Sequence, residues 1–241
     1  MMEYKNIVDI HCHVLPAIDD GPCNWDESLK MISMAKDNNI GKIITTPHWI
    51  KGTSWQPSAA RVINDVKRLN ELLDSQNIEV EVFTGMEIGI NEDLPELARR
   101  GEILTLANSN YLLVEIPFIS LPIGIEDIIF SLVSYGFIPL LAHPERNKEL
   151  QAEPGRILDL MERGALVQIT AGSLCGHWGN GAMNCSVELI ENEAVFAIAS
   201  DGHSVDRRPP EMFEALSILE RLVGENETRN ILSNSEKIIN N

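Results

Sequence analysis

The stretch VDIHCHVLPAIDDGP, residues 8–22, joins a short apolar run to a loop with two aspartates, a glycine and a proline. Alternate side chains of a strand share a face, so His11 and His13 are expected to point the same way and Cys12 the opposite way. Only six histidines occur in the whole chain. Two of them therefore meet at the end of one predicted strand, where both are candidate metal ligands.

Short apolar runs rich in β-branched residues recur along the chain, and amphipathic segments separate them. The predicted strands cover 6–11, 41–46, 80–85, 111–116, 137–142, 165–170 and 195–200. The predicted helices cover 24–38, 57–76, 125–136, 155–164, 209–224 and 225–240, and Asn24, three residues before Glu27, is placed to cap the first of them.

Repeated alternation of strand and helix is typical of a parallel sheet with right-handed crossovers. Seven such units and a trailing helix favour an α/β fold of the TIM-like (β/α)7 barrel kind. An open doubly wound sheet is less favoured, because no glycine-rich dinucleotide fingerprint follows the first strand. No linker or repeat divides the sequence, so a single domain over residues 1–241 is expected.

Composition narrows the class of protein. With 241 residues, 44% of them hydrophobic, the chain can bury a large core. No stretch approaches the ~18 uncharged apolar residues of a membrane span, so no membrane insertion is expected. The net charge is −17 and no basic stripe is visible, which argues against a nucleic-acid partner. A cytoplasmic location is expected, because the N-terminus resembles no secretory leader and the four cysteines form no C-x-x-C pair.

Histidines and acidic residues stand at or just after the ends of six of the seven predicted strands. In a β/α barrel these ends converge on one face, where barrel enzymes keep their active sites. So many polar groups are costly to bury together unless they are paired or bind metal. The predicted ligands are His11, His13, Asp20, His48, Glu87, Glu115, His143, Asp201 and His203.

Imidazole and carboxylate donors without thiolates suit Mn²⁺, Fe²⁺ or Zn²⁺, with Mg²⁺ as a further alternative. Nine donors exceed the needs of one ion, so two or three ions are expected. Arg146 stands three residues after His143, and Arg208 stands beside Arg207. Arginine forks bind phosphate, so both Arg146 and Arg208 are candidates for holding a phosphoryl group.

A histidine, most of one loop and three cysteines lie outside this predicted cluster. His177 fits no strand end and is expected on a loop surface. The segment 48–58, with Trp49 and Trp55, either grips a substrate or packs on the barrel. Among Cys23, Cys175 and Cys185, none has an arginine six residues on, so a cysteine-dependent phosphatase is not expected.

The motifs DIHCHVLPAIDDGP, TTPH, GMEIG, VEIPF, AHPERN, QITAGSL and ASDGH…RPP resemble, in order and spacing, one known family. This family comprises the bacterial manganese-dependent tyrosine-protein phosphatases of capsule and exopolysaccharide systems, in the polymerase-and-histidinol-phosphatase (PHP) superfamily. The resemblance implies a distorted seven-unit barrel with three metals. The implied ligand sets are His11, His13, Glu87 and Asp201 for one ion, Glu87, Glu115 and His143 for a second, and Asp20, His48 and His203 for the third.

The same resemblance implies the phosphate-binding residues, Arg146 and Arg208, and the partner. The reaction expected at the metal cluster is in-line attack on the phosphorus by a hydroxide between two ions, with His48 or His203 donating a proton through water. Whether Arg207 or Arg208 matches the family arginine stays open. The implied substrate is the phosphotyrosine tail of a bacterial tyrosine kinase of polysaccharide export. The loop CGHWGNGAMN, residues 175–184, matches no functional pattern.

Three other functions remain open at this stage. The first is a small-molecule phosphatase on the same scaffold, acting for instance on histidinol phosphate. The second is a metal-dependent amidohydrolase, although the rim offers Glu87 and Glu115 where that class normally has a bridging lysine. The third is a non-catalytic metal-binding or kinase-docking module.

Overall fold

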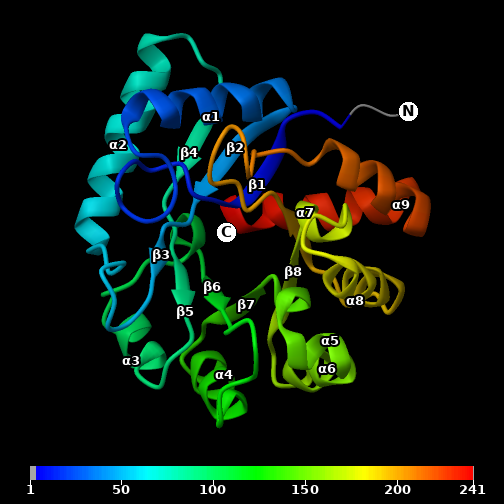
Figure 1. The fold of residues 1–241 in the computed structure, drawn as a ribbon. Helices are drawn as coiled ribbons and strands as arrows, with labels where there is room; N and C mark the ends of the chain where they lie inside the picture. Colours follow the sequence, from blue (N-terminus) through cyan, green and yellow to red (C-terminus); the bar gives the residue numbers. More distant parts are fainter. Residues whose placement is uncertain (1–3, 241) are drawn as a thin grey trace.

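A computed structural model describes residues 4–240 of the chain, and its strands form one distorted barrel (Figure 1). Each run predicted as a strand overlaps a strand of the structure, and two short strands that the sequence did not predict, at residues 48–49 and 87–89, follow the second and third runs. The strands are β1 (Ile7–Cys12), β2 (Ile40–Thr45), β3 (His48–Trp49), β4 (Glu81–Phe83), β5 (Glu87–Gly89), β6 (Tyr111–Glu115), β7 (Ile138–Ala142), β8 (Leu166–Thr170) and β9 (Ala197–Ala199). All their pairings are parallel, which confirms the α/β barrel prediction.

The second and third strands of the barrel are each broken in the middle. β2 pairs with β4. After a short interruption in each of these two strands, β3 pairs with β5. Pro47 lies in the first interruption and has no N–H to give to a ladder. Its carbonyl instead accepts from the backbone N–H of Glu87 at 3.2 Å. These breaks divide the barrel into a three-stranded and a six-stranded sheet.

The barrel closes where its first and last strands meet. Cys12 forms an isolated parallel bridge with Gly202. The N–H of His13 donates to the carbonyl of Gly202 at 2.8 Å, and the N–H of Asp201 donates to the carbonyl of His11 at 2.8 Å. The residues that follow β1 and β9 are thereby fixed side by side.

Apolar side chains fill the barrel interior beneath its mouth. Alternate residues of β6, β7 and β9 belong to this cluster. Val8 and Ile10 of β1 and Ile238 near the end of the last helix also belong to it. The pairing of β1 with β2 shifts register between Asp9 and Cys12. Because side chains alternate along a strand, this shift accounts for His11 facing the interior directly after Ile10.

Helices surround the strands on the outside (Figure 1). They are α1 (Trp25–Asp37), α2 (Ala59–Ser75), α3 (Leu94–Arg99), α4 (Ile125–Ser134), α5 (Lys148–Ala152), α6 (Gly155–Glu162), α7 (Ala171–Leu174), α8 (Asn180–Glu191) and α9 (Phe213–Ile239). The Asn24 side chain caps α1 by accepting from the N–H of Glu27, as predicted. Gly224, with a φ of 81°, interrupts α9 where the sequence predicts one helix to end and the next to begin.

Treating residues 175–184 as a loop was wrong in part, because α8 begins at Asn180. Glycine and asparagine have low helix propensity and obscure this helix in the sequence. Burial of Cys185 and Leu189 against the core stabilises it nevertheless. The short helices α3, α5 and α7 are also absent from the predicted set.

Within residues 4–240, no helix has the length and hydrophobicity that a membrane crossing requires. Residues 1–3, part of the N-terminal stretch that resembles no leader, lie outside the described residues. The prediction of one domain over residues 1–241 stays a prediction.

Removal of the buried Asp9 carboxylate is expected to destabilise the barrel closure. Asp9 has no exposed surface and accepts from the Ser200 hydroxyl, from the Ser200 N–H at 3.0 Å and from the His11 N–H at 3.3 Å. Asp9→Ala leaves these donors unpaired, and we expect it to lower the free energy of unfolding by about 3 kcal/mol. Urea denaturation measures this loss, and Asp74→Ala on the exposed face of α2 is the matched control. Equal stability of the two variants would contradict the assignment.

Candidate metal centre

The nine predicted donors lie together at the mouth of the barrel. Most of them are almost fully buried, with Asp20 the exception, since 41% of its side chain is exposed. Their elements are β1, β3, β5 and β6, and the loops that follow β1, β7 and β9. The parallel sheet brings these segments to one face, as the position of the donors at the strand ends predicts.

A first group of donors surrounds one point. The Nε2 atom of His11 lies 3.3 Å from Nε2 of His13, 3.2 Å from Oε2 of Glu87 and 3.3 Å from Oδ1 of Asp201. Ligand atoms ~2.1 Å from one ion in tetrahedral geometry lie about 3.4 Å from one another. The four donors are therefore spaced as the ligands of one ion are spaced.

A second group consists of His48, Glu87 and Glu115. Nδ1 of His48 lies 3.0 Å from Oε2 of Glu87 and 3.8 Å from Oε2 of Glu115. His143 stands beside this group, with its Nε2 atom 2.8 Å from Oε1 of Glu87 and 4.0 Å from Oε1 of Glu115. Glu87 is thus surrounded by histidines from several strands.

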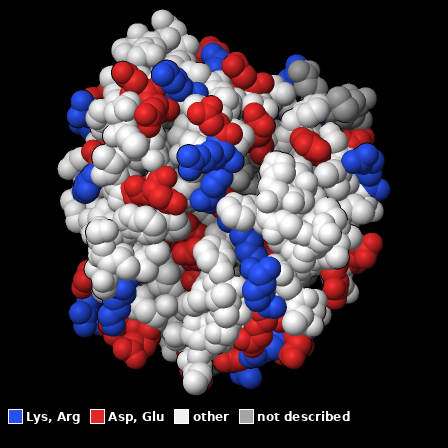
Figure 2. All heavy atoms as spheres, in the orientation of Figure 1, with Lys and Arg blue, Asp and Glu red and all other residues white. Residues whose placement is uncertain are grey.

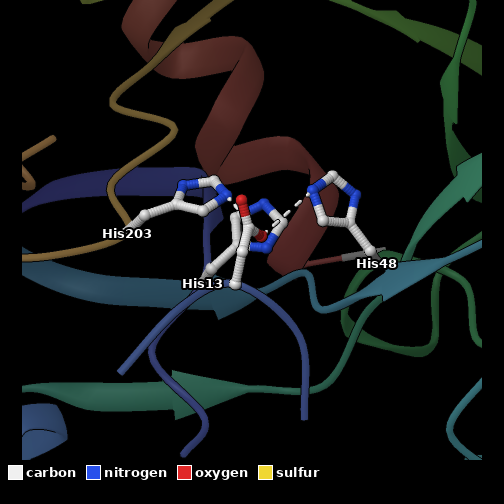
Figure 3. A group of neighbouring side chains, drawn as sticks. His13, His48 and His203 are labelled. Carbon is white, nitrogen blue, oxygen red and sulfur yellow. Dashed lines mark ion pairs between the residues drawn. The ribbon is translucent and has the colours of Figure 1, made fainter. Parts of the chain in front are cut away.

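A third group lies at the outer side of the mouth, where His13, His48 and His203 point toward one another (Figure 3). Oδ1 of Asp20 lies 3.4 Å from Nε2 of His48 and 3.3 Å from Nε2 of His203. The rings of His13 and His203 are stacked with their centroids 3.7 Å apart. In addition to the three residues expected here, the geometry includes His13.

Several buried donor atoms in this cluster have no hydrogen-bond partner among the described residues. They are Nδ1 of His48, Oε2 of Glu87, Nδ1 of His143, Oδ1 of Asp201 and Nε2 of His203. Buried polar atoms are normally satisfied, and a group left without a partner is costly. Four of these five atoms face the cluster, so the donor set fits divalent cations.

The charges in the cluster shift the pKa values of its members. Burial alone would lower the pKa of His11, but the carboxylates of Glu87 and Asp201 raise it to about 9. Burial would also lower the pKa of His48, but the carboxylates of Glu87 and Glu115 raise it to about 10. Burial and the charge of Glu87 raise the pKa of Glu115 to about 7. Bound protons are therefore favoured at these three residues and would be displaced by metal ions, whereas burial and the charge of His13 lower the pKa of His203 to about 4.

Two orienting residues are missing from the predicted set. Oδ2 of Asp19 lies 2.7 Å from Nδ1 of His13, and the same oxygen accepts from the backbone N–H of His48 at 3.0 Å. Oε1 of Gln168 lies 2.8 Å from Nδ1 of His11. Partners of this kind fix which ring nitrogen of a metal-binding histidine faces the metal. In the sequence, only its position next to the predicted ligand Asp20 points to a role for Asp19.

The backbone at two of the donors is left-handed. His143 has a φ of 33° and Asp201 a φ of 53°. Non-glycine residues rarely adopt this conformation, and such residues concentrate at functional sites. Each left-handed residue turns the chain sharply after its strand and directs its side chain into the barrel mouth.

Both candidate phosphate-binding arginines reach the cluster. Arg146 places Nη1 2.7 Å from Oδ2 of Asp201, and its Nη2 donates to Oγ1 of Thr170 at 2.7 Å. Arg208 places Nη2 2.6 Å from the same Asp201 oxygen. Arg207 has a backbone bond to Ser204 and is exposed. The geometry therefore favours Arg208 over Arg207 as the second arginine of the site.

Aromatic side chains surround the donors. Trp55 stacks on His48 with ring centroids 5.2 Å apart, and Phe118 stacks on His143 at 5.8 Å. Trp178 lies over the guanidinium of Arg146. In the segment 48–58 Trp49 is buried, so the two tryptophans there have different surroundings. Phe118 and Trp178 are absent from the predicted site.

Neither the cysteines nor the surface charge suggests another chemistry. Burial raises the pKa of the Cys175 thiol to about 11 and that of Cys185 to about 12, which disfavours reactive thiolates. His177 is exposed, as expected. On the face drawn in Figure 2, acidic and basic side chains are interspersed.

The fold and the cluster together define a class, that of the β/α-barrel hydrolases with a divalent metal centre at the carboxyl ends of the strands. Within this class, the sequence model of the family described as capsular polysaccharide synthesis, CpsB/CapC, matches residues 7–240. The chain belongs to this family.

Relatives of known name are similar over almost their whole length. The tyrosine-protein phosphatase YwqE of Bacillus subtilis is 36% identical over 236 residues, which are 98% of this chain and 92% of the relative. CpsB of Streptococcus pneumoniae, also a tyrosine-protein phosphatase, is 26% identical over 97% of this chain and 98% of its own.

Solved structures agree with the family. One from a study of YwqE and CpsB, described as unique metal-dependent tyrosine phosphatases, aligns with a TM-score of 0.94 and 35% identity, over 98% of this chain and 95% of its own. An amidohydrolase from Mycoplasma synoviae has a TM-score of 0.63 at 10% identity, over 97% of this chain and 87% of its own, and so shares only the fold.

Proposed function

We propose that this protein is a metal-dependent phosphatase that hydrolyses phosphotyrosine in proteins. One observation carries the proposal: the three donor groups form a connected set. His13 is common to the first and third groups, Glu87 to the first and second, and His48 to the second and third. Three adjacent cation sites suit a phosphate ester, because several oxygens of its phosphoryl group can each lie next to a cation. The names of the relatives support phosphotyrosine as the substrate.

The proposed metal ligands are the nine donors named from the sequence. His11, His13, Glu87 and Asp201 would hold one ion, Glu87 and Glu115 with His143 or His48 a second, and Asp20, His48 and His203 a third. When bound, these ions would supply positive charge to the phosphoryl oxygens and lower the pKa of water toward ~7. The proposed ion is Mn²⁺, with Fe²⁺, Zn²⁺ or Mg²⁺ as alternatives, because carboxylate donors suit Mn²⁺ and Mg²⁺ and imidazole donors suit Fe²⁺ and Zn²⁺.

Arg146 and Arg208 would bind the phosphoryl group. Both guanidiniums reach the same oxygen of Asp201, so their forks converge at the edge of the cluster. Both Nε atoms are buried without a hydrogen-bond partner among residues 4–240. A phosphate oxygen would satisfy these donors, and charge that develops on the transferring group would be stabilised by two cations held in place beforehand.

His48 and His203, as ligands of the third ion, would serve the leaving group through a water held there. Their Nε2 atoms lie 3.4 and 3.3 Å from Oδ1 of Asp20, the most exposed of the nine donors. A tyrosyl oxygen leaves with a pKa of about 10, far below that of an alkoxide, and so needs only modest proton donation. This difference favours tyrosyl over seryl phosphate.

The proposed partner is a bacterial tyrosine kinase of polysaccharide export, and the proposed location is the cytoplasm. Support comes from the family description, which names capsular polysaccharide synthesis. A substrate on a flexible protein tail also fits a cluster whose outer member, Asp20, is exposed.

Metal removal is the test of the proposed function. Protein stripped by a chelator is expected to lose at least ~100-fold in kcat/KM on a phosphotyrosine peptide, because the donors alone supply no charge stabilisation. Adding back Mn²⁺, Fe²⁺, Zn²⁺ or Mg²⁺ singly should restore activity and rank the ions. Activity that survives stripping would reject the metal mechanism. Preference for histidinol phosphate over the peptide would favour the small-molecule phosphatase instead.

A further inference from the structure

The turn between α7 and α8 presents a tryptophan to both site arginines. The Cζ atom of Arg146 lies 4.1 Å from the centre of the Trp178 ring, and that of Arg208 lies 5.3 Å from it. Both distances fall within the ~6 Å range of cation–π attraction. One indole therefore attracts both of the cations that the proposed function assigns to phosphate.

Local structure fixes this indole, although 42% of Trp178 is exposed. The turn is closed by backbone bonds from Gly176 to Ser173 and from Gly179 to Gly176, each 3.0 Å, and both glycines have positive φ. The ring lies directly over Gly172, where an added Cβ would meet the indole Nε1 at 3.2 Å. A backbone surface without a side chain thus supports the ring.

The two arginines need such support. Their guanidiniums carry like charges, yet both bind the same Oδ2 atom of Asp201, at 2.7 and 2.6 Å. Arg146 also donates to Thr170, whereas the Arg208 guanidinium has, among residues 4–240, only a 3.9 Å approach to Asp20 in addition to Asp201. Trp178 also lines a cavity of about 340 Å³ that borders Arg146, Asp201 and Arg208. Without the indole, one side of both guanidiniums would face this space.

We propose that Trp178 is a positioning residue that holds Arg146 and Arg208 together in the orientation that binds the phosphoryl group. This inference rests on the proposed function, because it concerns the same phosphate. The indole acts through the arginines. Its loss frees both forks at once, and phosphate then has to order them again when it binds.

Inorganic phosphate, titrated calorimetrically into the metal-loaded protein, tests the proposal without turnover. Trp178→Leu removes the aromatic face and is expected to weaken phosphate binding about tenfold, whereas Trp178→Phe retains the face and should stay within about threefold of the parent. Trp25→Leu is the matched control, because Arg68 lies 4.5 Å above Trp25 in the same kind of contact away from the site. Its phosphate affinity should equal that of the parent.

A double-mutant cycle separates positioning from a general structural role. In an Arg146→Ala background, Trp178→Leu should cost clearly less than in the parent, because one of the cations it positions is gone. Equal costs in the two backgrounds, or parental phosphate affinity in Trp178→Leu, would overturn the inference. If phosphate binding depends on Trp178 but the parent hydrolyses no phosphotyrosine, the proposed function fails and the inference stands.

Discussion

Glu87→Gln is expected to lower kcat/KM on a phosphotyrosine peptide by at least ~10³ and to reduce the number of bound metal ions. The carboxylate lies within 3.3 Å of ring nitrogens of His11, His13, His48 and His143. It also belongs to two of the three donor groups. Mutation of residues that merely orient metal ligands lowers metal affinity or activity by ~10–100-fold. Loss of a ligand shared by two ions should therefore lower them further.

Metal content by elemental analysis and steady-state kinetics together measure this effect. The control is Glu92→Gln, since the Glu92 side chain is 87% exposed and lies 3.9 Å from Lys51 in a solvent-exposed ion pair. It should retain parental metal content and activity. A Glu87→Gln enzyme with full metal content and less than a tenfold loss would refute the shared-ligand role.

Arg146→Lys is expected to reduce kcat/KM by about 10², although the charge is kept. Lysine has no planar fork and is unable to contact Asp201, Thr170 and a phosphate at the same time. Loss of one fixed donor to a transition-state oxygen typically costs about 10²–10³ in rate. Arg146 is 7% exposed, so the shorter and more hydrated ammonium would also be poorly accommodated.

The value of kcat/KM on an aryl phosphate measures this loss. Arg207→Lys, the same substitution at an exposed position, is the control. Arg207 is exposed, and its backbone N–H donates to the Ser204 hydroxyl. The control should remain within about twofold of the parent, as surface substitutions usually do. A large loss in Arg207→Lys with none in Arg146→Lys would reverse the assignment of the phosphate-binding arginines.

The sequence predicted the barrel because strand and helix patterns are local properties. Each strand run carries its own apolar pattern, and the parallel topology then determines that strand ends share one face. The convergence of donors from residue 11 to residue 203 follows from these two facts alone. The grouping of particular donors around shared points does not, because it depends on side-chain directions at the ends of several strands.

The features that the sequence did not predict depend on distant contacts or on backbone conformation. Asp19 orients His13 only because the loop after β1 folds back over the mouth. The left-handed backbone at His143 and Asp201 has only a weak sequence signal, because aspartate and histidine adopt this conformation more often than other non-glycine residues but still rarely. The place of Trp178 depends on α8, which low helix propensity obscured in the sequence.

The meeting of β1 with the segment after β9 has a consequence for biosynthesis. The earliest donor is residue 11 and the last is residue 203, so a ribosome must release most of the chain before the two ends of the donor set can join. A nascent chain that stops before β9 lacks Asp201 and His203. The first and third donor groups are therefore completed only after residue 203 has left the ribosome, whereas the second group, with His48, Glu87 and Glu115, is already complete in the first 115 residues.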